Sequence, residues 1–142
     1  MAYRTEFSIH GIQEAQQRNL KRIAALQPAG EAGLAVRDAL VALHRYAVSI
    51  THVGKYKVGG VFVGGGSLRA SERIEVNGLE GKVFIDPDTK NPRSKIPPVE
   101  YAVYENARGG EHAFADRTVN EIGEDVKNRV VTRIKNAVIH VQ

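Results

Sequence analysis

The 142-residue sequence contains no cysteine, which excludes disulfide bonds and any metal site built from thiolates. It has no uninterrupted apolar run near the roughly 18 residues that a membrane-spanning helix needs. The first residues are charged and lack the apolar core of a signal peptide. We therefore expect a soluble protein that is made in the cytoplasm and has no membrane partner. A chain of this length is expected to form a single domain over residues 1–142.

The net charge of +4 is distributed unevenly along the chain. Residues 1–60 contain eight Lys and Arg against four Asp and Glu, whereas residues 61–142 contain twelve of each. A basic excess of this kind weakly favours contact with a polyanion such as DNA. Charge also serves simply to keep a protein in solution, so both interpretations stay open.

The pattern closest to a nucleotide-binding loop is G-V-F-V-G-G-G-S at Gly60–Ser67. Gly66 stands where such a loop needs a lysine to contact the phosphates, and we therefore expect no bound nucleotide. No two histidines have the i, i+4 spacing of a zinc site on one helix. We expect no metal ion and no other cofactor. The five histidines are His10, His44, His52, His112 and His140.

The carboxylates form no recognisable catalytic set. Asp86 and Asp88 could bind a cation in a loop, but basic residues and a proline occupy the places where further oxygen ligands would be needed. Glu100 and Glu105 need not share a face, so they do not suggest an acid–base pair. The sequence also lacks helix-turn-helix and zinc-finger signatures. We predict no catalytic residue and no enzyme activity.

The first 53 residues are predicted to be helical. Apolar residues at helical spacing indicate one helix over residues 12–26, which Pro28 and a following glycine end. A second helix is expected from residue 31 to about residue 50 or 52, with Gly54 as its C-terminal cap.

Residues 54–105 are predicted to contain a small, mostly antiparallel sheet. Residues 56–63 alternate between apolar and other residues, but Gly59-Gly60 interrupts them, which predicts a bent or bulged strand. Asn77-Gly78 lies between two further strand-like segments and is a hairpin signal. The loop over 86–98 contains four prolines, and we expect it to be stiff and functional.

The last segment, residues 113–139, is predicted to be a long amphipathic helix, because its apolar residues recur at steps of three or four. The sequence thus predicts an α+β fold with N-terminal helices, a small mostly antiparallel sheet, and a long C-terminal helix packed on it. The apolar positions of that helix are Phe114, Val119, Ile122, Val126, Val130, Ile134 and Val138.

Four short motifs follow one another in a distinctive order. They are the G-G-G-S-L-R-A-S turn at Gly64–Ser71, the Y-A-V-Y-E segment at Tyr101–Glu105, the glycines at 109 and 110, and the H-A-F sequence at His112–Phe114. In this order and spacing the chain resembles a family of tailed-bacteriophage neck and tail-completion proteins, also described as minor capsid or head–tail connector components. The resemblance covers roughly residues 31–138.

The chain departs from the family pattern at several points. The threonine usual in the turn is missing, Asn106–Gly109 replaces the usual Phe-Gly-Thr, and Ala113 stands where proline is common. The loop over 86–98 is longer than usual. These departures bear on which layer of the neck the protein would occupy more than on its fold.

The resemblance implies a structural virion protein that forms a ring in the phage neck around the DNA channel, in tail completion or tail termination. It implies a homo-oligomer of sixfold symmetry, with twelvefold symmetry as the alternative. Head-completion and tail-tube proteins would be its neighbours, and passing DNA a transient, non-specific contact. The implied location is the virion, after synthesis in the host cytoplasm. A non-specific nucleic-acid-binding module is the alternative function.

Two groups of residues are candidates for these contacts. Tyrosine suits interfaces because it joins an apolar ring to a polar hydroxyl, although a core position for both tyrosines of the Y-A-V-Y-E segment is equally open. Leu68 is expected to anchor the preceding turn, which would direct its neighbour Arg69 outwards to a carboxylate of the next subunit. The proposed interface residues are Arg69, Tyr101, Tyr104 and Glu105. The loop residues that would face the lumen or an adjacent ring, with simple solvation as the alternative, are Lys90, Arg93 and Lys95.

Overall fold

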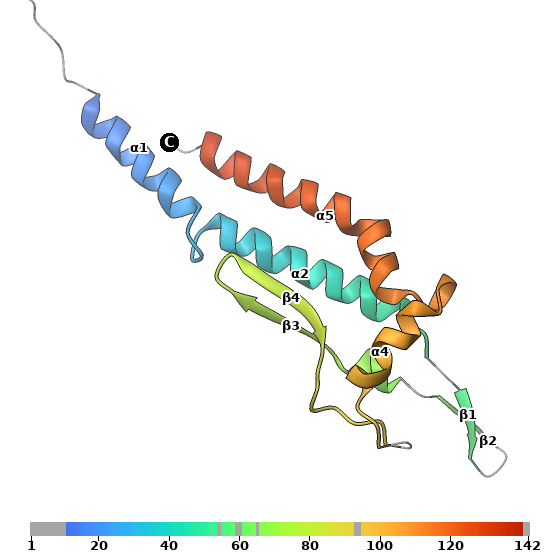
Figure 1. Cartoon of the computed structure of the whole chain (residues 1–142). Coiled ribbons are helices and arrows are strands. Elements are labelled where there is room, and N and C mark those ends of the chain that lie inside the picture. The colour runs from blue at the N-terminus through green and yellow to red at the C-terminus, as the bar shows by residue number, and fades with distance from the viewer. Residues whose placement is uncertain (1–10, 54, 59–60, 65, 93–94, 141–142) are drawn as a thin grey trace, which may run out of the picture.

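Helices dominate the computed structural model, and two antiparallel hairpins supply its strands (Figure 1). The structure describes residues 11–53, 55–58, 61–64, 66–92 and 95–140. The predicted α+β class is confirmed. In chain order the elements are α1 (Ile12–Ala25), α2 (Glu31–Ile50), β1 (Lys55–Val58), β2 (Val61–Gly64), α3 (Ser67–Ala70), β3 (Glu72–Asn77), β4 (Glu80–Ile85), α4 (Pro98–Ala107), the 3-10 helix η1 (Gly110–His112) and α5 (Phe114–Ile139).

The two longest helices, α2 and α5, lie side by side and antiparallel (Figure 1). Small buried side chains of α2, Ala32 and Ala35 among them, allow the two backbones to approach, and Val126 is the buried contact from α5. The predicted bounds of both helices are confirmed to within a few residues; the proposed cap at Gly54 lies outside the described residues. We expected α5 to pack on the sheet, but its main partner is α2.

The β3–β4 hairpin forms where the Asn77-Gly78 signal predicted it. Asn77 pairs with Glu80 at its end, and Gly78 adopts a left-handed φ of 66° in the turn, which glycine accepts without steric cost. The hairpin packs on α2. A Cβ at Gly81 would lie 2.1 Å from Leu40 Cδ1 and 2.7 Å from the Glu75 carbonyl oxygen, so a larger residue would force the Leu40 side chain and the β3 backbone to shift.

The segment before this hairpin differs from the prediction. Instead of one bent strand over 56–63, β1 and β2 pair with each other, and Val58 is opposite Val61; residues 59–60 lie outside the described residues. The two hairpins are separate two-stranded sheets, not one sheet over 54–105. Gly66, with φ 102°, begins the short helix α3 that turns the chain from one hairpin to the other. The end of that range is also not strand, because α4 begins at Pro98.

The apolar core is small. Its centre is Leu68, Ala102 and Phe114, with Ile85 and Tyr101 packed against it, and the expectation that Leu68 anchors its turn is confirmed. Among the side chains that the structure describes, fourteen large apolar ones are exposed and only four are buried. The small core therefore leaves many apolar side chains of the described residues exposed to solvent.

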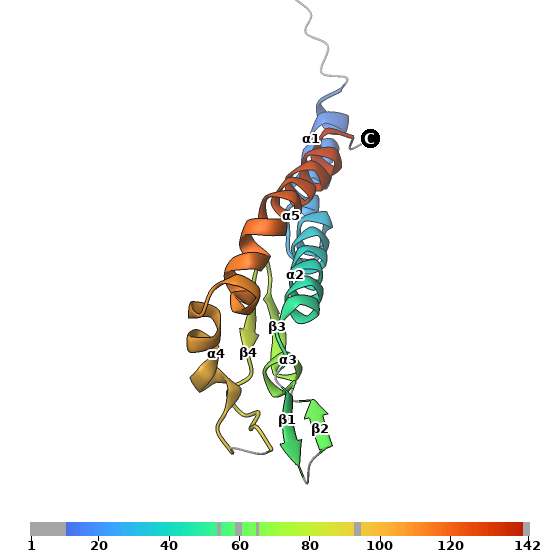
Figure 2. The same ribbon diagram turned by 90° about the vertical axis from the view of Figure 1, so that its right-hand side faces the viewer.

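The molecule is elongated (Figures 1 and 2). At one end α1 lies beside the last turns of α5. At the other end lie the strands β1 and β2 and the described parts of the loop, residues 86–92 and 95–97, and Figure 2 shows β4 between α2 and α4. No helix within the described part of the chain combines the length and apolar character needed to cross a bilayer.

Candidate functional site

Arg69, expected to face a neighbouring subunit, instead binds its own chain. Its Nε and Nη2 donate hydrogen bonds of 3.2 and 2.6 Å to the carbonyl oxygen of Thr51, the residue that ends α2. The guanidinium therefore satisfies a carbonyl at the helix C-terminus, where positive charge is favourable. Arg69 thus turns towards a helix end within its reach, and its contact with a neighbouring subunit stays a prediction.

The two tyrosines of α4 have different environments. Tyr101 packs on the core cluster, and its hydroxyl accepts a hydrogen bond of 3.4 Å from Asn91 Nδ2. Tyr104 is 74% exposed. The structure thus assigns Tyr101 to the core and leaves Tyr104 as an exposed interface candidate.

The basic loop presents Lys90 and Lys95 to solvent, whereas Arg93 lies outside the described residues. Backbone hydrogen bonds from Lys95 N to Asn91 O (2.8 Å) and from Asn91 N to Ile96 O (3.0 Å) close the base of the loop. Lys95 has a φ of 62°, which is uncommon for a residue with a Cβ. These hydrogen bonds tie the backbone beside Lys90 to the backbone at Lys95 and Ile96.

An apolar groove of about 480 Å³ lies between α2, β4, α4 and the first turns of α5. Val103 and Val119 belong to its lining and are 72% and 66% exposed. Asn106, also in the lining, accepts hydrogen bonds from the backbone N–H groups of Ala115 and Asp116 and so caps α5 from α4. The remaining lining comprises Leu40, Leu43, Ala47, Glu72, Gly81–Ile85, Ala102, Phe114, Ala115 and Thr118.

One buried carboxylate lines this groove. Glu72 is 3% exposed; its Oε1 accepts a 2.7 Å hydrogen bond from the Thr51 hydroxyl, and its Oε2 has no partner among the described atoms. Burial raises the pKa of Glu72, although the Thr51 hydrogen bond and the charges of His44 and Arg69 act in the opposite direction. The groove is therefore apolar with one acidic group at its floor.

A second cluster lies where α2, α4 and η1 meet. His112 Nδ1 is 2.5 Å from Glu105 Oε1, and His52 Nδ1 is 3.9 Å from the same oxygen. The two imidazole rings have their centroids 4.5 Å apart. Arg108 Nη1 donates to Glu105 Oε2 at 3.2 Å. Glu105, proposed as an interface residue, is thus engaged within its own chain.

Burial alone would raise the pKa of Glu105, but the hydrogen bonds from His112 and Arg108 and their positive charges outweigh it and lower the pKa. The carboxylate is therefore ionised at neutral pH. No pattern in the sequence indicated this cluster, because its two histidines lie on different elements and are 60 residues apart, far from the i, i+4 spacing of a site on one helix.

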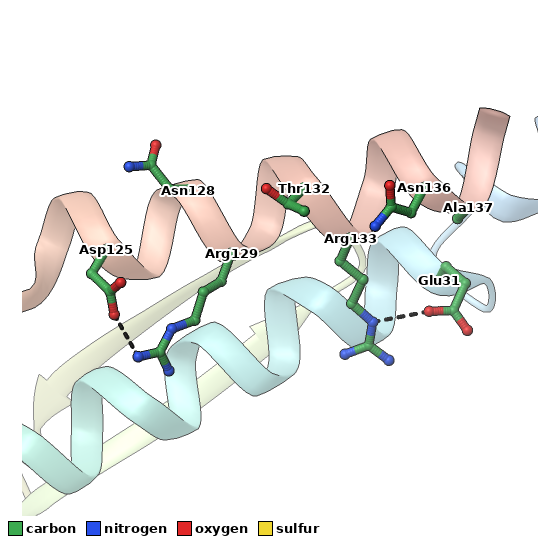
Figure 3. Close-up of a pocket in the computed structure, with 8 residues that line it drawn as sticks. All are labelled: Glu31, Asp125, Asn128, Arg129, Thr132, Arg133, Asn136 and Ala137. Atoms are coloured by element: carbon green, nitrogen blue, oxygen red, sulfur yellow. Dashed lines mark hydrogen bonds and ion pairs between the residues drawn. The ribbon is translucent and has the colours of Figure 1, made fainter. Parts of the chain in front are cut away.

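A hollow between α2 and α5 is lined mostly by polar and charged residues, and we call it the polar hollow (Figure 3). Arg133 Nε donates to Glu31 Oε2 at 2.9 Å and its Nη1 to Asp38 at 2.5 Å, while Arg129 pairs with Asp125 at 2.5 Å. Each of these carboxylates has a cation beside it, so the hollow offers no carboxylate pair for acid–base chemistry. Its lining is Glu31, Asp125, Asn128, Arg129, Thr132, Arg133, Asn136 and Ala137.

No family model matches this chain, and no curated protein or solved structure shows significant similarity to it.

Proposed function

We propose that this chain is a structural, non-enzymatic virion protein that forms a homo-oligomeric ring in the neck of a tailed phage, in contact with head-completion and tail-tube proteins. The observation that carries the proposal is the excess of exposed over buried large apolar side chains among the described residues. Exposed apolar surface marks protein–protein contacts where it is contiguous, as in the groove beside α4 that Val103 and Val119 help to line.

The exposed apolar surface has two complementary parts. α1 buries none of its residues, and Ile12, Leu20 and Ile23 are all more than half exposed on one side of the helix. A helix of 14 residues gains little stability in water without a buried apolar face, and the contact of α1 with the end of α5 buries none of its residues. Within the described part of the chain, Val103 and Val119 leave the groove beside α4 with exposed apolar walls. An amphipathic helix placed in an apolar groove is a common mode of recognition.

The two parts cannot meet within one chain. Arg22 of α1 donates a 3.2 Å hydrogen bond to the Val138 carbonyl near the end of α5. Val138 and Phe114, which lines the groove, are roughly 36 Å apart along α5 at the helical rise per residue. The helix that fills the groove would therefore come from a second copy. Contacts between two different surfaces of identical copies are heterologous, and they generate rings when the rotation closes.

Electron-microscopy class averages of the purified protein and of virions test the proposal. We expect closed rings of six copies, or of twelve, positioned between the head and the tail. Virions that assemble normally and infect without this protein would refute the neck role. Turnover of a small molecule by the purified chain would refute the non-enzymatic role.

Substitutions at two exposed positions test the contact between α1 of one copy and the groove of the next. Ile23→Asp alters α1 and Val103→Asp alters the groove, and each variant alone should fail to self-associate in sedimentation. An equimolar mixture retains one intact helix and one intact groove, so it should form a 1:1 complex. Val131→Asp is the matched control, because Val131 is exposed on α5 but does not line the groove; this variant should assemble as the unaltered chain does. A mixture that stays monomeric would rule out the α1–groove contact.

The exposed Lys90 and Lys95 support an additional contact with DNA that passes through the lumen of the ring. They also favour the second candidate function, which is non-specific nucleic-acid binding. Phosphate contacts made by lysine weaken as salt increases. A duplex retarded by the purified chain at low salt, and less retarded by the Lys90→Ala/Lys95→Ala variant, would favour this role. No retardation at low salt would exclude it.

A further inference from the structure

We propose that His52, Glu105 and His112 bind a divalent transition-metal ion of the zinc class at the junction of α2, α4 and η1. Each residue offers one ligand atom, and these atoms all lie within 4.8 Å of one another. Imidazole nitrogen and carboxylate oxygen are the ligands that zinc takes when thiolates are absent.

The spacing of the three side chains suits such an ion. Zinc bonds of 2.0–2.1 Å in tetrahedral geometry place neighbouring ligand atoms about 3.3 Å apart. The present separations from Glu105 Oε1 are 2.5 Å to His112 Nδ1 and 3.9 Å to His52 Nδ1. Zinc binding would therefore require the His112 nitrogen to move away from Glu105 Oε1 and the His52 nitrogen to move closer to it. The ion would replace the hydrogen bond between His112 Nδ1 and Glu105 Oε1.

Groups around the cluster can orient the ligands. The second nitrogen of His112, Nε2, is 3.6 Å from Glu111 Oε1, just beyond hydrogen-bond distance; a small movement of the exposed Glu111 side chain would give the carboxylate–histidine arrangement that commonly supports a metal-bound imidazole. Arg108 holds Glu105 Oε2, so Oε1 is directed towards the histidines. His52 follows Thr51, whose carbonyl and hydroxyl are held by Arg69 and Glu72.

The position of the cluster indicates a structural role for the ion. His52 lies just beyond the end of α2, Glu105 in the last turn of α4, and His112 in η1 before α5. Figure 1 shows that the chain from α4 to α5 passes the end of α2 here. One ion would therefore join three segments and fix α4, which carries a wall of the apolar groove. The cluster itself lines neither the groove nor the polar hollow.

Titration calorimetry of the full chain with Zn²⁺ tests the site. We expect one ion per chain and a higher Tm in Zn²⁺ but not in Mg²⁺, because Mg²⁺ prefers oxygen ligands. His52→Gln alters an exposed side chain and should weaken Zn²⁺ binding by at least about tenfold, since one of the three ligands is lost. His140→Gln is the matched control, because it removes an exposed histidine at the end of α5 and should leave the affinity unchanged.

Glu111→Gln provides a second test that cannot fail through misfolding, since Glu111 is 74% exposed. Loss of the outer partner of His112 should weaken Zn²⁺ binding by about tenfold. Co²⁺ bound in place of Zn²⁺ should give the visible absorption of a tetrahedral site, and His52→Gln should abolish it. Absence of Zn²⁺ binding, or equal affinity in His52→Gln and His140→Gln, would overturn the proposal and leave the cluster as a hydrogen-bond network. Because the sedimentation test of the α1–groove contact is run without metal, the two proposals can be refuted separately.

Discussion

The two ends of α5 are held in different ways. Towards its C-terminus α5 pairs with α2 through small apolar residues, and the surface above them carries exposed ion pairs such as Arg133 with Glu31 and Asp38. At its N-terminus Phe114 enters the core cluster, and buried polar groups such as Thr51 and Glu72 lie close by. We call the first region the helix pair and the second, formed by the end of α2, α3, α4, η1 and the start of α5, the junction.

This difference indicates which of the two regions contributes more to the free energy of unfolding. Exposed ion pairs contribute little, because water and salt screen them. Buried side chains and buried hydrogen bonds are costly to disrupt, because the cavities and unpaired groups left behind cannot be solvated. The junction should therefore dominate the free energy of unfolding, and the helix pair should tolerate change.

Truncation of the central junction side chain should have the largest effect. Phe114→Ala removes the aromatic ring from the core cluster and should reduce the free energy of unfolding by about 3–5 kcal/mol. Chemical denaturation measures the change. Val119→Ala on the same helix is the control, because Val119 is 66% exposed and its loss should cost no more than about 0.5 kcal/mol. Similar losses in both variants would contradict the distinction between core and surface.

Neutralising Glu105 should have the next largest effect. Glu105→Gln removes a charged acceptor of hydrogen bonds from His112 and Arg108 and should cost about 1–3 kcal/mol at neutral pH without metal. Because the folded state lowers the pKa of Glu105, its contribution is fully present above the ordinary pKa of glutamate and is lost as the pH falls through the lowered value. Thermal unfolding at several pH values should show the difference between the proteins shrinking in acid. Glu124→Gln, at an exposed pair with Lys127, should show no such pH dependence.

The buried Glu72 should behave in the opposite sense. Burial raises its pKa, so its ionisation destabilises the fold increasingly as the pH rises from the ordinary glutamate value through the raised one. Glu72→Gln should therefore raise Tm at neutral pH and give no gain in acid, where the native carboxyl is already protonated. Glu75→Gln is the control on the same strand, because Glu75 is exposed and paired with Lys82. A lower Tm for Glu72→Gln at neutral pH would show that the charged form is stabilised.

The smallest effect is expected in the helix pair. Arg133→Gln removes the ion pairs to Glu31 and Asp38 and should lower Tm only slightly at low ionic strength. The difference should vanish in high salt, because exposed charges are screened over a few ångströms there. Calorimetric scans at two salt concentrations measure this. A large, salt-independent loss would place Arg133 among the residues that hold the fold and remove the contrast between the two regions.

The local elements were determined by the sequence itself. The apolar spacing of α2 and α5 specifies two long helices, and Pro28 ends the segment before α2. Asn77-Gly78 specifies the tight turn between β3 and β4. These signals are local because consecutive residues set the backbone dihedrals and the periodicity of an element. The same residues did not specify that α2, and not the strands, would be the main partner of α5.

Only the tertiary structure decided the surroundings of individual side chains. It turned Arg69 towards the end of α2, separated the environments of Tyr101 and Tyr104, and brought Glu105 between His52 and His112. Such contacts join residues that are far apart in sequence, so they depend on how whole elements pack and not on any local pattern. The sequence therefore determines which polar and charged groups are present, and the packing of the helices determines which of them contact one another.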